Sequence, residues 1–89
     1  MPQKIKSQIK MDDDEEKVLQ ALSRTGAMQP SQLAAETLML PADLNNLLRG
    51  LADLRLVILR PDNTPDGQVV ILTGEGKQAL SQYQANKGA

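Results

Sequence analysis

Residues 40–80 read LPADLNNLLRGLADLRLVILRPDNTPDGQVVILTGEGKQAL, and the order of apolar and turn-forming residues in them predicts a helix, a hairpin and a second helix. Pro41 suits the first position of a helix. Four leucines then follow at the spacing of one helical face: Leu44, Leu47, Leu48 and Leu51. The apolar runs 56–59 and 69–72 predict two strands, and the turn-forming residues between them predict a β-hairpin. Thr73 is then expected to cap a last helix over about 74–86, which buries Ala79, Leu80 and Tyr83.

A first helix is predicted upstream of this stretch, over about 13–24. Asp12 and Glu15 have the Asp-x-x-Glu spacing of a capping-box variant, and the run of acids suits the positive end of a helix dipole. Gly26 is a good terminating residue. The acid run 12–16 could instead be an interaction patch, but helix capping explains it more simply.

Pro30 predicts the start of a second, short helix that ends near residues 37–39. Its inward-facing residues are expected to be Leu33, Ala34 and Leu38. Together with the helix from Pro41 it forms a helix-turn-helix. The complete order predicts an α+β fold, a winged helix-turn-helix with three helices followed by a β-hairpin wing and a C-terminal helix. We expect a flexible basic arm over 1–11, the winged-helix domain over 12–86 and a polar tail over 87–89.

The composition excludes much chemistry. The 89 residues contain no Cys and no His, so there is no disulfide framework, thiolate nucleophile or imidazole base, and the usual zinc ligands are absent. No glycine-rich phosphate-binding motif occurs, and the acid run lacks the spacing of a calcium loop. We therefore expect no enzyme, no cofactor and no metal site. No apolar run is long enough for a membrane span or a signal peptide, so a cytoplasmic protein without membrane contact is expected.

The net charge of −1 conceals an uneven distribution. Residues 1–10 carry three lysines and no acid, whereas residues 11–17 carry five acids and one lysine. From residue 18 onward six basic and six acidic residues cancel. A neutral body argues against strong phosphate binding, which needs clustered Lys and Arg. The arm is either a solvated tail or a segment that a partner orders as a helix, because Ile5 and Ile9 are four residues apart.

The stretch 40–80 resembles the recognition helix, wing and closing helix of MarR-type winged-helix regulators. The family's pattern is Leu-x-x-x-Gly-Leu-Val, then Arg, a loop with Asp-x-Arg, a strand and Leu-Thr-x-x-Gly. The corresponding segments here are residues 51–57, Arg60, residues 66–68 and residues 72–76, and residues 32–36 resemble the family's preceding helix. The resemblance implies a homodimeric DNA-binding transcriptional regulator.

Three features depart from that family pattern. Arg55 stands where the family usually has Gly, at a helix end that favours a left-handed backbone. Gln68 stands where the wing Arg is expected, and an amide cannot neutralise a phosphate. The family's dimer-forming helices at both ends have no complete counterpart within 89 residues.

The candidate DNA-reading residues lie on the polar side of the helix that Pro41 opens. In a helix-turn-helix the second helix enters the major groove, where Asn can bind adenine and Arg can bind guanine. The candidates for base contacts are Ala42, Asn45, Asn46 and Arg49. The alternative is that they form only the solvated side of an amphipathic helix.

Contacts to the DNA backbone are expected from three other places. The start of the second helix offers Gln29, Ser31 and Gln32, and the hairpin offers Arg60, Asn63, Thr64 and Gln68. The basic arm offers Lys4, Lys6 and Lys10. Asp62 and Asp66 oppose such binding, although Asp66 is expected to cap the turn at Gly67. The rival hypothesis is a winged-helix protein-interaction module or adaptor subunit that binds a protein partner and no DNA.

Overall fold

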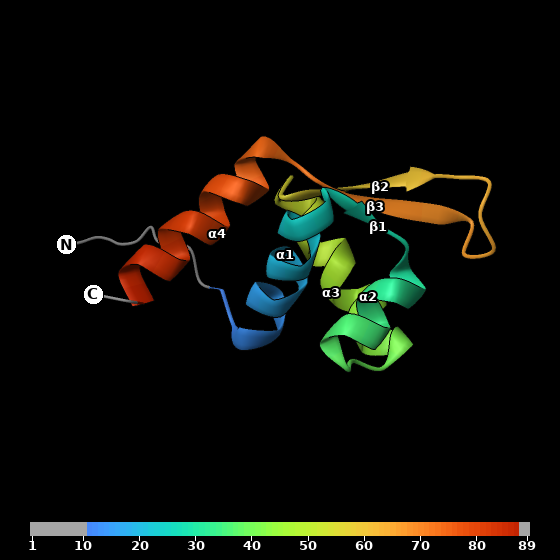
Figure 1. The fold of residues 1–89 in the computed structure, drawn as a ribbon, viewed down its shortest axis with the longest axis horizontal. Helices are drawn as coiled ribbons and strands as arrows, with labels where there is room; N and C mark the ends of the chain where they lie inside the picture. The colour runs from blue at the N-terminus through green and yellow to red at the C-terminus, as the bar shows by residue number, and fades with distance from the viewer. Residues whose placement is uncertain (1–10, 88–89) are drawn as a thin grey trace.

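Three helices lie on one side of a small antiparallel sheet, and a fourth leans away from them and packs on α1 (Figure 1). The computed structural model describes residues 11–87. Along the chain the elements are α1 (Asp13–Thr25), β1 (Ala27–Met28), α2 (Pro30–Thr37), α3 (Pro41–Asp53), β2 (Val57–Pro61), β3 (Gln68–Leu72) and α4 (Gly74–Lys87). The predicted α+β winged helix-turn-helix is confirmed, with β2 and β3 as the projecting wing.

The start of α1 has the capping box that the sequence predicted. The backbone N–H of Glu15 donates to the Asp12 carboxylate at 2.9 Å, and the Asp12 N–H donates to the Glu15 carboxylate at 3.0 Å. Gly26 is the C-cap that follows the last residue of the helix, and its φ of 85° lies in the left-handed region that glycine adopts freely. The carboxylates of Asp12 and Glu15 therefore accept hydrogen bonds from backbone N–H groups that have no partner within the helix.

The core is formed mainly by leucines of the three helices. Leu33 of α2 is fully buried, and Leu44, Leu48 and Leu51 of α3 are each 1% exposed. Leu47, at the edge of the same stripe, is half-buried and packs against the core. Met11 is also buried there, at 7% exposure, while Tyr83 of α4 packs against the core's surface.

The inward orientation predicted for Leu38 is wrong. Leu38 is 91% exposed, because α2 ends at Thr37 and the next residue adopts a left-handed backbone, φ 59°, that turns its side chain outward. Thr37 takes the buried place one position earlier, and its hydroxyl donates to the Leu33 carbonyl at 2.6 Å. A helical spacing rule fails where the helix has already ended.

The sheet has the order β1-β3-β2, and β1 was not predicted because two residues carry no readable pattern. Ile58 pairs with Ile71 and Val57 with Leu72 in the wing. Leu56 and Asp62, on either side of β2, both bond toward β3. The alternation of antiparallel pairing therefore points the backbone groups of Val57, Leu59 and Pro61 to the open edge of β2. Proline is tolerated at such a position because its missing N–H costs no ladder bond.

The turn from α3 into β2 is tied directly to the start of α4. The Thr73 hydroxyl lies 2.8 Å and 2.9 Å from the carbonyls of Arg55 and Leu56, and it accepts the Gly76 N–H at 2.9 Å. Thr73 is thus the predicted N-cap of α4, and it also joins two elements. Arg55 adopts φ 63°, the left-handed conformation that the family's Gly would adopt at lower cost.

Gly76 is expected to tolerate no side chain. A Cβ at this position would collide with the Leu56 carbonyl oxygen and lie 2.7 Å from a Leu72 methyl carbon. Gly76→Ala should lower the free energy of unfolding by about 2 kcal/mol, measured by urea denaturation. Gly50→Ala is the matched control, because a Cβ added there would have no neighbour within 4 Å and alanine favours the helix by about 1 kcal/mol. Equal effects at the two sites would contradict the close approach at Gly76.

Arg55→Gly is expected to stabilise the protein. Glycine relieves the left-handed strain at φ 63°, so the free energy of unfolding should rise by about 0.5–1 kcal/mol. Arg49→Gly, the same replacement inside α3, should instead lower it by about 1 kcal/mol. Chemical denaturation of both variants checks the opposite signs, and destabilisation by Arg55→Gly would refute the assignment of strain.

Candidate nucleic-acid interface

The predicted base-reading residues all lie exposed along one arc of α3. Successive residues of an α-helix turn by about 100°, so burying the leucine stripe directs Ala42, Asn46 and Arg49 to the opposite side. Asn45 lies on the flank of that arc and is also exposed. The amides and the guanidinium are therefore available to an external partner. Asp53 lies on the same side of the helix as Asn46 and Arg49, and Asp43 is exposed on the same helix.

The start of α2 is less available than the sequence suggested. Gln29 is its N-cap, and the Gln29 N–H donates to the side-chain oxygen of Gln32 at 3.2 Å. The Ser31 N–H donates to the Asp66 carboxylate at 2.8 Å. Two of the backbone donors that could meet a phosphate are thus already bonded within the chain.

Asp66 does not have the role that we predicted for it. Its carboxylate caps α2 from the wing, 35 residues away in sequence, and within the described part of the chain it makes no bond to the turn at Gly67. Hydrogen bonds from the backbone and side chain of Ser31 hold the pKa of Asp66 below its ordinary value. The first turn of α2 contains no acid of its own, which is the one sequence signal that a carboxylate would come from elsewhere.

The remaining wing candidates occupy different environments. Arg60 and Asn63 are exposed, on β2 and in the loop after it. The Thr64 hydroxyl is buried and has no hydrogen-bond partner among the described residues. Gln68, half-buried at the start of β3, shares a cavity of about 250 Å³ with Ser31, Asn45 and Asp66. This cavity is where α2, α3 and the wing meet, so the structure brings together residues from three of the predicted contact regions.

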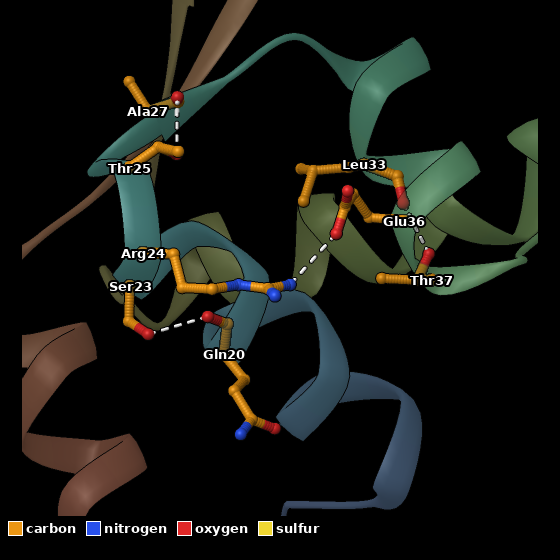
Figure 2. Close-up of polar contacts among 8 residues, drawn as sticks. All are labelled: Gln20, Ser23, Arg24, Thr25, Ala27, Leu33, Glu36 and Thr37. Atoms are coloured by element: carbon orange, nitrogen blue, oxygen red, sulfur yellow. Dashed lines mark hydrogen bonds and ion pairs between the residues drawn. The ribbon is translucent and has the colours of Figure 1, made fainter.

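Charge on these elements is net negative. Residues 29–68 carry three arginines (Arg49, Arg55, Arg60) and five carboxylates (Glu36, Asp43, Asp53, Asp62, Asp66), a net charge of −2. One carboxylate is compensated from α1, because Arg24 reaches Glu36 at 3.0 Å, as Figure 2 shows. Four carboxylates still face three arginines. The predicted contacts Lys4, Lys6 and Lys10, which would reverse this balance, lie outside the described residues.

The helices and acidic side chains also bear on metal and membrane binding. Within residues 11–87, no group of three or more His, Cys, Asp or Glu side chains is placed to hold a metal ion. None of the helices that the structure describes has the length and apolar character needed to cross a membrane.

Comparison with known proteins rests on solved structures. No protein-family model matches the chain, and no curated protein matches it. BpsR of Bordetella bronchiseptica, whose DNA binding is described as regulated by 6-hydroxynicotinic acid, is 22% identical with a TM-score of 0.76, over 82% of this chain and 53% of that chain. A MarR family transcriptional regulator from Silicibacter pomeroyi is 22% identical with a TM-score of 0.74, over 85% of this chain and 51% of that chain.

A shorter relative matches over most of both chains. A winged-helix DNA-binding protein from STIV is 20% identical with a TM-score of 0.72, over 86% of this chain and 89% of that chain. The present chain spans about half the length of the two longer regulators. At these identities the likeness establishes the fold: the chain has the winged-helix architecture that MarR family regulators share.

Asp66→Asn is expected to weaken the clip between the wing and α2. Because the folded-state pKa of Asp66 is lowered, its stabilising contribution is present above the unfolded-state pKa and is lost as pH falls through the folded-state pKa. The variant should therefore melt at a lower temperature than the parent at neutral pH, and the gap should close as the pH falls through the lowered pKa of Asp66. Thermal unfolding followed by circular dichroism across pH checks this, with Asp62→Asn as the control in the same loop. Identical melting temperatures at neutral pH would contradict a stabilising clip.

Proposed function

We propose that this chain is a sequence-specific DNA-binding transcriptional regulator that places α3 in the major groove. The observation that carries the proposal is the exposed side of α3, where Asn46 and Arg49 point away from the leucine stripe and Asn45 lies exposed on the flank. Its winged-helix fold, shared with MarR family regulators, supports the same interpretation.

The side chains on this arc match the chemistry of base edges. An amide can bond adenine through N6 and N7, and a guanidinium can bond guanine through O6 and N7. Asn45, Asn46 and Arg49 thus favour a site that contains both kinds of base pair. The Asp43 carboxylate can accept a hydrogen bond from the cytosine amino group, so this acid of α3 could contribute a base contact.

Backbone contacts would come from the wing and the arm. Arg60 is exposed on β2, and the hairpin projects beyond the helices (Figure 1). Because residues 29–68 are net negative, counterion release there is small, and the three lysines of the arm would supply most of the phosphate contacts. The N-terminus of α2 contributes through Ser31 only if the Asp66 carboxylate gives up its hydrogen bond.

A second copy would complete the regulator. A two-fold homodimer presents two recognition helices to half-sites spaced by one helical turn of DNA, roughly 34–36 Å, or a multiple of it. We expect such pairing to use the first or last helix. We also expect the regulator to act in the cytoplasm.

The second candidate function is a winged-helix module that binds a protein and no DNA. The net charge of −2 on the α2–α3–wing segment favours it, since DNA binders concentrate Lys and Arg on the contacting face. If this candidate is right, the chain should bind no duplex DNA of any sequence, even at low ionic strength.

Arg49→Ala is expected to weaken binding to the preferred duplex by about 5- to 150-fold, which corresponds to 1–3 kcal/mol for one lost bidentate contact. Duplexes selected from a random pool by the unaltered chain are titrated by fluorescence anisotropy at several salt concentrations. Arg49→Lys is the matched control: it keeps the charge, so non-specific binding should persist while base preference at one position relaxes. An unaltered chain that binds no duplex at low salt would refute the proposal and leave the protein-binding module.

A further inference from the structure

The turn between α2 and α3 exposes two large apolar side chains. Leu38 is 91% exposed and Leu40 is 69% exposed, and they are separated by one residue. Isolated surface leucines need no explanation, but these two share one short turn. Both leucines line the same groove, together with polar and charged side chains.

The backbone at Leu38 is also unfavourable for a leucine. Its φ of 59° lies in the left-handed region, where glycine or asparagine is usual and another residue costs about 1 kcal/mol. For the stability of the fold, a residue other than leucine would be better at position 38. A leucine there has an unfavourable backbone conformation and exposes its apolar side chain to water. The left-handed backbone ends α2 as its C-cap, so folding requires this conformation but does not require a leucine in it. The choice of leucine is therefore consistent with a contact outside the folded body.

The surroundings of the two leucines define the chemistry of that contact. They belong to a groove of about 400 Å³ between the start of α1 and the α2–α3 turn, and Leu47 contributes further apolar surface to it. The charged residues of the groove are Asp14, Asp43 and Lys17. An occupant of this groove should be apolar and basic.

We propose that residues 4–10 of the same chain occupy this groove. The segment reads KIKSQIK, so Ile5 and Ile9 can meet the leucines while three lysines face the carboxylates. It contains no acid that would oppose the contact. Two isoleucines among three lysines complement two leucines beside two carboxylates, and Lys17 is the one cation among the groove's lining residues that opposes the contact.

Tethering favours the segment from the same chain over one from a second copy. Met11 is buried in the core, and Asp14 of the groove follows only three residues later. The segment is thus anchored close to the groove, and its seven residues reach at most about 23–25 Å when extended. A short tether gives an effective concentration in the millimolar range, well above that of a free partner chain.

Docking would have a regulatory consequence. The three lysines that bind the groove are the same ones proposed to contact the DNA backbone, so the groove and DNA compete for them. This competition rests on the proposed DNA binding, whereas docking itself does not. A chain whose arm is held in the groove would bind DNA more weakly than a variant whose groove is disabled.

Docking can be tested in the full-length chain with a single spin label. The sequence contains no cysteine, so Ser7→Cys provides one unique attachment point within the segment. We expect paramagnetic broadening of the amide signals of Leu38, Leu40 and Asp43, measured by NMR against the reduced label. The broadening should be lost in the Leu38→Ser/Leu40→Ser double variant and strongly weakened in 1 M salt, where the Debye length is about 3 Å.

Leu54→Ser is the matched control, because Leu54 is 62% exposed but does not line the groove. It should leave the broadening at the groove unchanged. Broadening centred elsewhere, no localised broadening, or an equal effect of Leu54→Ser would each overturn the proposal. So would broadening that arises only between molecules, detected by mixing isotope-labelled chains without the spin label with unlabelled chains that carry it.

The same variants separate this proposal from the DNA-binding proposal. If both hold, Leu38→Ser/Leu40→Ser should bind duplex DNA more tightly than the parent chain, whereas Leu54→Ser should not. Localised broadening without any DNA binding would support docking and refute the proposed function. DNA binding without broadening at the groove would support the proposed function and refute docking.

Discussion

The burial of the leucine stripe of α3 is the constraint on which the remaining structure depends. Leu44, Leu48 and Leu51 are almost completely enclosed, and each contributes roughly 1.5–3 kcal/mol by leaving water. Rotating α3 by a single residue, about 100°, would expose most of that surface. The orientation of the polar arc is therefore determined by the core. The polar side chains need no interactions of their own to hold them outward.

A second constraint comes from contacts that are distant in sequence. The wing would be a marginal hairpin if it stood alone, since two strands rarely hold together in water. Here β1 adds a third strand, Asp66 bonds the wing's loop to α2, and Thr73 joins the base of the wing to the start of α4. The wing therefore keeps a defined position beside α3. The cost is that the Ser31 N–H is already occupied by the protein's own carboxylate.

Most of the fold could be predicted because its signals are local. The capping pair Asp12 and Glu15, the prolines that open α2 and α3 and the N-cap Thr73 each act within about one helical turn. The features that were missed depend on tertiary context. Strand β1 exists only because β3 lies beside it, and Asp66 finds its partner 35 residues away. The prediction for Leu38 was wrong because its apolar side chain and helical spacing do not reveal that the helix ends one residue earlier.

For the candidate site, the exposed arc of α3 could be predicted from the periodicity of the leucines. The charge balance around the arc and the cavity near Asn45 depend on how α2, α3 and the wing are assembled.

The proline at the end of β2 has a consequence for behaviour at high concentration. An exposed strand with free amides is a template on which another molecule can add, and repeated addition leads to fibrils. Within β2, Pro61 offers no amide and Val57 is only 2% exposed, so Leu59 is the one edge position left to pair. One residue cannot sustain a growing cross-β ladder. The outer edge of β2 therefore offers a second molecule little to pair with, although Ile58 is exposed on the surface of the wing.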